Sequence, residues 1–78
     1  MIYTDGIHLV SDISNAELHR FAKKIGLKRE WFQDKKGHPH YDLITERKTN
    51  LALLHGAKKI PKRAIIKLLK IKERGLVK

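Results

Sequence analysis

The chain has 78 residues, 41% hydrophobic content and a formal net charge of +10 at pH 7, which allows one small folded domain and excludes a large core. It contains no cysteine, so disulfides and thiolate zinc sites are excluded, and any metal ligands must be His, Asp or Glu. The sequence shows no signal-peptide pattern and no apolar run long enough to span a bilayer, and we expect a soluble, cytoplasmic protein without membrane insertion.

The N-terminal part predicts a short strand followed by a helix. Residues 1–4 are β-prone and end at the turn Asp5-Gly6, after which residues 7–10 can continue as extended chain. Ser14 and Glu17 have the spacing of a capping box, which marks a helix start. Gly26 then marks the end of this helix, whose apolar stripe at i, i+3, i+4 and i+7 consists of Leu18, Phe21, Ala22 and Ile25.

A second strand is predicted at residues 27–33, closed by turn residues at 34–37. The order strand, helix, strand is typical of a βαβ unit, in which the two strands run parallel. We therefore expect an α/β fold: a small βαβ-type domain with two or three short, mainly parallel strands and three helices. The carboxyl ends of parallel strands meet at one edge of a sheet, which is expected to gather the polar residues after each strand: Asp5, His8, His38, His40 and Asp42.

Residues 37–43, with the sequence Gly-His-Pro-His-Tyr-Asp-Leu, are predicted to form a rigid polar connector. Pro39 removes a backbone donor and disfavours the helical conformation at the residue before it. The helix that follows begins near Asp42 or Thr45, either of which can cap it, and ends at about His55.

The C-terminal part predicts a basic amphipathic helix. Residues 57–60 can form a very short third strand, and Pro61 suits the first position of a helix over residues 61–74. We divide the chain into a compact α/β unit at 1–57 and a basic helix at 58–78 that packs on it or extends from it, within a single domain. Nine Lys and Arg residues in the second part face one acid, and four of them form a stripe on the helix: Arg63, Lys67, Lys70 and Arg74.

Several motifs of the first part resemble a small family of bacterial and phage proteins that is classed as a domain of unknown function. The similarity covers roughly residues 1–57, and the block around His38 is its most specific part. It implies a compact α/β domain with a polar site and assigns no activity, and the basic helix lies outside it. The motifs that carry the resemblance are Asp5, His8-Leu9, Glu17-Leu18-His19, Phe21-Ala22, Ile25-Gly26-Leu27, Trp31-Phe32-Gln33, His38-Pro39-His40-Tyr41-Asp42-Leu43 and Gly56-Ala57.

The polar residues around the connector suggest two kinds of chemistry. His38 and His40, with Asp5 or Asp42, can form a site for Zn²⁺, Mn²⁺ or Fe²⁺ that hydrolyses a phosphodiester, with Arg47 and a helix start holding the phosphate. Alternatively, a histidine oriented by a neighbouring carboxylate can act as a general base without metal. The structural alternative is that Asp42 caps the helix and the histidines bond to backbone groups. The candidate catalytic residues are Asp5, His8, His38, His40 and Asp42.

The charge distribution leads to our first functional hypothesis, which is largely sequence-independent binding of DNA or RNA by a bacterial or phage accessory protein. A second hypothesis is an enzyme or metal-binding domain acting on a phosphate-bearing substrate at the polar residues, and a third is an inhibitor or adaptor of an acidic host protein. A homodimer through the apolar face of the last helix is also compatible with the sequence. Truncation after Ala57 is expected to remove the first and third functions and to spare the second. The candidate phosphate-binding residues are Arg47, Lys58, Lys59, Lys62, Arg63, Lys67, Lys70 and Arg74.

Overall fold

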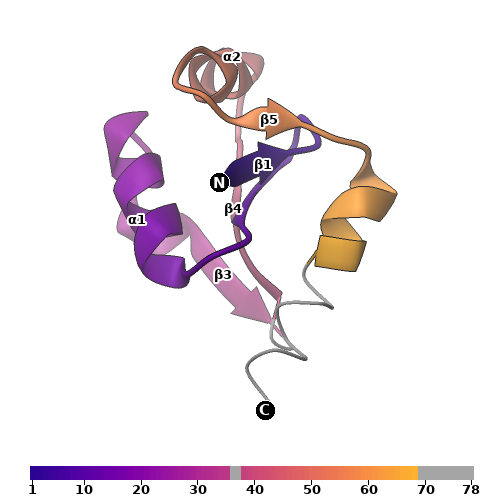
Figure 1. Cartoon of the computed structure of the whole chain (residues 1–78). Coiled ribbons are helices and arrows are strands. Elements are labelled where there is room, and N and C mark those ends of the chain that lie inside the picture. The colour runs from indigo at the N-terminus through magenta and orange to yellow at the C-terminus, as the bar shows by residue number, and fades with distance from the viewer. Residues whose placement is uncertain (36–37, 69–78) are drawn as a thin grey trace.

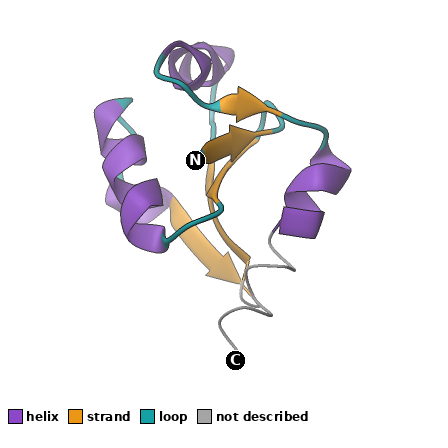
Figure 2. Cartoon of the chain, viewed as in Figure 1, coloured by secondary structure: helices purple, strands orange, loops and turns teal. Residues whose placement is uncertain are grey.

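A computed structural model describes residues 1–35 and 38–68 of the chain. It contains a mixed α/β fold built on one five-stranded sheet with the strand order β3-β4-β2-β1-β5 (Figures 1 and 2). The strands are β1 (Ile2–Thr4), β2 (His8–Ser11), β3 (Phe32–Lys35), β4 (His38–Asp42) and β5 (Lys58–Lys59).

Helices lie on both faces of this sheet. Helix α1 (Asn15–Lys24) covers one face, and residues 62–68 form a helix on the opposite face, whereas α2 (Glu46–Leu54) lies near the β5 end of the sheet (Figure 1). A single turn of 3-10 helix, η1 (Arg29–Trp31), precedes β3. None of the helices within the described ranges has the length and apolarity needed to cross a membrane.

The sheet is mostly antiparallel, so the expectation of mainly parallel strands is wrong. β1 pairs antiparallel with β2, β2 with β4, and β4 with β3, and the one parallel pair among the described strands is β1 with β5. The strands on either side of α1, β2 and β3, do run in the same direction, but β4 lies between them. The expected pairing fails because a hairpin joins β1 to β2 before the helix begins, and because β4 folds back onto β3.

The predicted strand at 27–33 and the predicted connector at 37–43 also differ from the structure. The predicted strand at residues 27–33 begins only at Phe32, because η1 occupies the preceding positions. The predicted connector at 37–43 is strand β4 over most of its length. Pro39 is tolerated there because the pairing of β4 with β2 extends only from Asp42 to Tyr41, so Pro39 lies beyond it.

The helix starts are capped by the predicted hydroxyl residues. The Ser14 side chain accepts a hydrogen bond from the Glu17 backbone N–H, while the Glu17 carboxylate accepts from the Ser11 hydroxyl, so the reciprocal half of the capping box is missing. Thr45 caps α2 by accepting from the Lys48 N–H, and Asp42, the other predicted cap, belongs to β4 instead. Asp42 therefore does not cap α2, because its backbone is paired in the sheet as part of β4.

Alternation along β4 separates the two faces of the sheet. Pro39 and Tyr41 are buried, and the alternating residues His38, His40 and Asp42 are only partly buried. The main core lies on the α1 face and contains Ile2, Leu9, Leu18, Ala22, Ile25, Leu27, Tyr41, Leu43, Ala52 and Ala57. A smaller core lies on the opposite face, where Ile65 of the helix at 62–68 packs on Val10 together with Tyr3 and Ile60.

Protonation of His19 is expected to destabilise the fold at mildly acidic pH. His19 Nδ1 lies 2.8 Å from the Tyr41 hydroxyl on the α1 face. Burial, helped by the nearby Arg29 charge, lowers the pKa of His19 below its ordinary value of 6.5. The unfolded chain therefore binds this proton more readily, and the stability that neutral His19 contributes is lost as the pH falls from about 6.5 through the folded-state pKa.

The measurement is the thermal midpoint of the wild type and of His19→Gln between about pH 7.5 and about pH 5. Glutamine can still hydrogen-bond the Tyr41 hydroxyl but does not titrate, so the midpoint of the variant should fall less on acidification. Equal losses in both proteins would contradict the assignment, since the other histidines are common to both.

Candidate functional site

Two imidazoles and a carboxylate converge on the face of the sheet opposite α1. His8 of β2 is paired directly with Asp42 of β4, and His40 lies two residues before Asp42 on the same face. His40 Nε2 lies 3.5 Å and His8 Nε2 3.9 Å from Asp42 Oδ1. One ligand atom from each of the three residues fits within a span of 4.8 Å. We call His8, His40 and Asp42 the His–Asp cluster.

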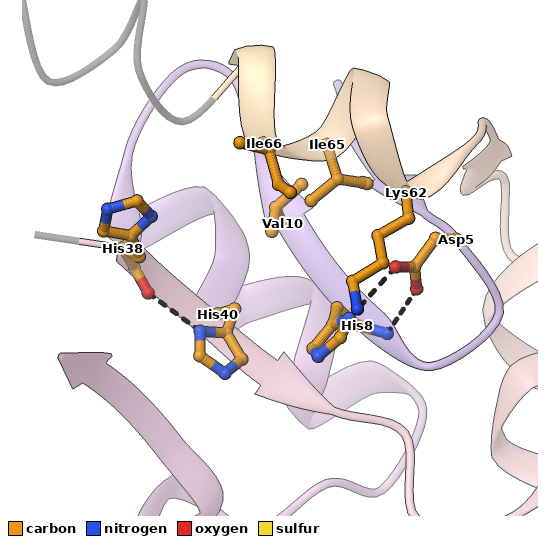
Figure 3. Close-up of a pocket in the computed structure, with 8 residues that line it drawn as sticks. All are labelled: Asp5, His8, Val10, His38, His40, Lys62, Ile65 and Ile66. Atoms are coloured by element: carbon orange, nitrogen blue, oxygen red, sulfur yellow. Dashed lines mark hydrogen bonds and ion pairs between the residues drawn. The ribbon is translucent and has the colours of Figure 1, made fainter.

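Each residue of the His–Asp cluster uses its second polar atom to bond a neighbour. His8 Nδ1 bonds Asp5 Oδ2 at 3.0 Å, and His40 Nδ1 bonds the backbone oxygen of His38 at 2.8 Å (Figure 3). Asp42 Oδ2 accepts a hydrogen bond from Gln33 Nε2 at 2.6 Å. A backbone carbonyl and an ionised carboxylate can only accept a hydrogen bond. The Nδ1 atom of each histidine must therefore be the donor and carry the proton. With the proton on Nδ1, each Nε2 is left as an acceptor, and these two atoms and an Asp42 carboxylate oxygen lie close enough together to be ligands of one ion.

Asp5 orients His8 from a tight turn. Its Oδ1 accepts from the backbone N–H groups of Ile7 and His8, at 2.8 and 2.7 Å. Burial disfavours the charged form of Asp5, but the bonds from the His8 ring and from the two N–H groups outweigh it and lower the pKa of this carboxyl. The turn is also tied to α2, because the Thr49 hydroxyl donates to the backbone oxygen of Gly6 at 2.8 Å.

A cavity of about 230 Å³ adjoins the cluster, between the sheet and the helix at 62–68. In the close-up, His8 and His40 lie on the sheet side, Ile65 and Ile66 hang from the helix, and the Lys62 side chain extends down toward Asp5 and His8 (Figure 3). The cavity is thus lined by polar groups, most of them on the sheet side, and by aliphatic groups under the helix. Its lining residues are Asp5, His8, Val10, His38, His40, Lys62, Ile65 and Ile66.

The predicted site residues are brought together only in part. The set expected to bind metal was His38 and His40 with Asp5 or Asp42. In the structure Asp42 is the carboxylate and His8 stands in place of His38, while Asp5 bonds the His8 ring and the His38 backbone oxygen bonds the His40 ring. His38 still lines the cavity. Arg47 is exposed on α2 and is not among the lining residues.

Sequence reasoning missed Gln33, Ile65 and Ile66, and it assigned Lys62 to the basic surface rather than to the cavity. Gln33 lies on β3 directly opposite His40, so its amide reaches Asp42 only because β3 pairs with β4. No local motif marks such a contact. Lys62, Ile65 and Ile66 reach the cavity because the helix packs on Val10. Truncation after Ala57 would therefore remove one wall of the cavity, which contradicts the expectation that it would spare a function of the polar residues.

Comparison with known proteins identifies the family. The chain matches, over residues 4–72, the family described as "Protein of unknown function (DUF4031)". The chain belongs to this family. Searches of curated proteins and of solved structures found no match to it. The family match runs well beyond residue 57 and includes the described helix at 62–68, so this helix is part of the DUF4031 domain rather than an addition to it.

The predicted basic residues of the C-terminal part that the structure describes lie at exposed positions of this DUF4031 domain, on β5 and on the helix at 62–68. Lys62 lines the cavity, Arg63 and Lys67 are exposed on the same helix, and Lys58 and Lys59 form the edge strand β5. Lys70 and Arg74, the last two members of the predicted stripe, lie outside the described residues.

Replacement of Asp5 is expected to destabilise the DUF4031 domain. The Asp5 side chain is 4% exposed, and Asp5→Ala would leave the Ile7 and His8 N–H groups and the His8 ring without their acceptor. We expect the free energy of unfolding to fall by about 1–3 kcal/mol, and by less in Asp5→Asn, which keeps an oxygen for the two backbone donors. Urea unfolding measures both variants. Asp34→Ala, at an exposed position of β3, is the control, and an equal loss there would contradict the assignment.

Proposed function

We propose that this protein binds a divalent metal ion through His8, His40 and Asp42 and hydrolyses a phosphate ester with it. The observation that carries this proposal is the convergence of three ligand atoms whose residues are each oriented by a separate partner. A metal-bound histidine characteristically donates its other ring N–H to a carboxylate or a backbone carbonyl, and His8 and His40 each have one of these two partners.

The distances in the His–Asp cluster suit a metal ion. Ligands at about 2.1 Å from a tetrahedral Zn²⁺ lie about 3.4 Å from one another. The separations of 3.5 and 3.9 Å between each Nε2 and Asp42 Oδ1 need only a small contraction to reach that value. Two imidazoles with one carboxylate suit Zn²⁺, Mn²⁺ or Fe²⁺, and three protein ligands leave at least one position for water or substrate.

Hydrolysis follows from what such a centre and its surroundings can do. A divalent ion lowers the pKa of bound water to about 7 and polarises a phosphoryl oxygen. Attack of the water oxygen on phosphorus would break the bond to the leaving oxygen, which would take up the proton that the water loses. The Lys62 ammonium group on the cavity wall favours an anionic substrate over a neutral one.

Metal binding is tested with MnCl₂ or ZnCl₂ and the thermal midpoint. We expect either ion to stabilise the wild type, by about 2.7 kcal/mol when its concentration is about 100 times Kd. His8→Ala, His40→Ala and Asp42→Asn should each lose most of this stabilisation, because each removes one ligand. His55→Ala is the control: it removes an exposed histidine at the end of α2, and the metal ion should still stabilise this variant.

The same samples test the chemistry with bis(para-nitrophenyl) phosphate, an activated phosphodiester. Activity should require added metal, disappear with EDTA and be lost in His40→Ala. Activity that is indifferent to EDTA would contradict the metal centre and favour acid–base catalysis by His8, which Asp5 orients as it would a general base.

Nucleic-acid binding is a second candidate function, favoured by the five basic residues at exposed positions on β5 and the helix at 62–68. These residues can contact phosphates without reading sequence. We expect the affinity for a short DNA or RNA to fall steeply with salt, and Arg63→Ala combined with Lys67→Ala to lower the log–log salt slope by about 2. The matched control is Lys23→Ala with Lys24→Ala on α1, on the opposite face of the sheet. A flat salt dependence in the wild type would contradict this candidate.

A further inference from the structure

The cavity beside the His–Asp cluster has two chemically different sides. His8, His40 and Asp5 lie on one side, and Val10, Ile65 and Ile66 form an aliphatic wall on the other (Figure 3). A phosphate held at the cluster would therefore have an apolar slot next to it. Inorganic phosphate would leave that slot empty, so the shape suits a phosphate that carries a flat or apolar group.

Ile66 indicates that the slot is a binding surface rather than part of the core. Ile65 is buried against Val10 at 3% exposure, whereas Ile66 next to it remains 41% exposed although it lines the same cavity. Covering an exposed isoleucine with a ligand is favourable in proportion to the apolar area removed from water. His38 adds a second flat surface to the cavity, and its ring is outside the His–Asp cluster.

The volume limits what can enter. Cavities for drug-sized ligands are typically about 300–1,000 Å³, and this one measures about 230 Å³. This size suits one planar ring system beside a phosphate better than a base pair. A base in a duplex is stacked and paired, so it would have to leave the helix at a cost of a few kcal/mol before it could enter.

We propose that the cavity takes one unpaired nucleotide of a single-stranded nucleic acid. Its base lies against Ile66, Ile65 and Val10, and its phosphate faces Lys62 and the His–Asp cluster. This inference rests on the proposed hydrolytic function and names its substrate class. The exposed Lys58, Lys59, Arg63 and Lys67 contact the phosphates that flank this nucleotide, which explains why a small catalytic domain carries so much positive charge.

The test measures binding of the full chain, with MnCl₂ present, to fluorescent single-stranded DNA, single-stranded RNA and blunt duplex of one sequence. Fluorescence anisotropy gives the affinities, and gels of the same samples show cleavage. Single strands should bind more tightly than duplex and be cleaved faster, and the DNA and RNA arms show which sugar the site accepts.

The base-binding slot is tested with Ile66→Ala. We expect about fivefold weaker binding of single strands, because a partly exposed side chain loses its contact with the base. Binding of an abasic strand of equal length should not change, since it has no base to place there. Ile13→Ala, at an exposed isoleucine that follows the opposite end of β2 from His8, should leave both affinities unchanged.

Two results would overturn the inference while leaving the proposed function intact. One is equal binding of duplex and single strands by a wild type that binds Mn²⁺ and cleaves bis(para-nitrophenyl) phosphate. The other is an equal loss of affinity for normal and for abasic strands in Ile66→Ala. A wild type that fails to bind Mn²⁺ or Zn²⁺ overturns the proposed function, and the inference with it.

Discussion

The antiparallel register between β2 and β4 determines where every residue of the candidate site lies. His8 is paired with Asp42 and Leu9 with Tyr41, so polar and apolar pairs alternate along the two strands. One pair faces the solvent side and the next is buried in the core under α1. A shift of β4 by one residue would place Tyr41 on the open face and turn Asp42 toward the core. The free energy gained by burying the core therefore also holds the His–Asp cluster in place.

Local signals in the sequence predicted local structure well. Ser14 and Thr45 cap the two helices, and Gly26 and Gly56 follow their ends with positive φ values of 83° and 106°. The short strand before Pro61 is present as β5, parallel to β1. Each of these features depends on a few neighbouring residues, which is why the sequence alone was enough.

Strand pairing was harder to predict because its deciding contacts are distant in sequence. The gathering of Asp5, His8, His40 and Asp42 was expected from a parallel βαβ edge, but it arises from an antiparallel pair. Pro39 indicated only that residues 37–43 are not helical, and the pairing of residues 38–42 with β3 and β2 makes this connector a strand. His38 and His40 also have different roles, because the backbone oxygen of His38 bonds the ring of His40. No rule based on residue spacing predicts this hydrogen bond.

Charge composition also suggested a boundary that packing removes. Residues 58–78 hold nine basic residues and were expected to pack on the α/β unit or to extend from it. In the structure Ile65 is buried against Val10, and Lys62 and Ile66 line the cavity beside the cluster. A helix added only for its charge would need no such packing, since a solvated basic face binds polyanions equally well from a flexible tether. Packing fixes the position of Lys62 relative to His8 and Asp5, and a fixed cation beside an oriented ring is worth more to a reacting phosphate than a mobile one. The helix and the polar residues therefore form two walls of one cavity, in which the sheet orients His8 and His40 and the helix supplies Lys62 and an apolar surface.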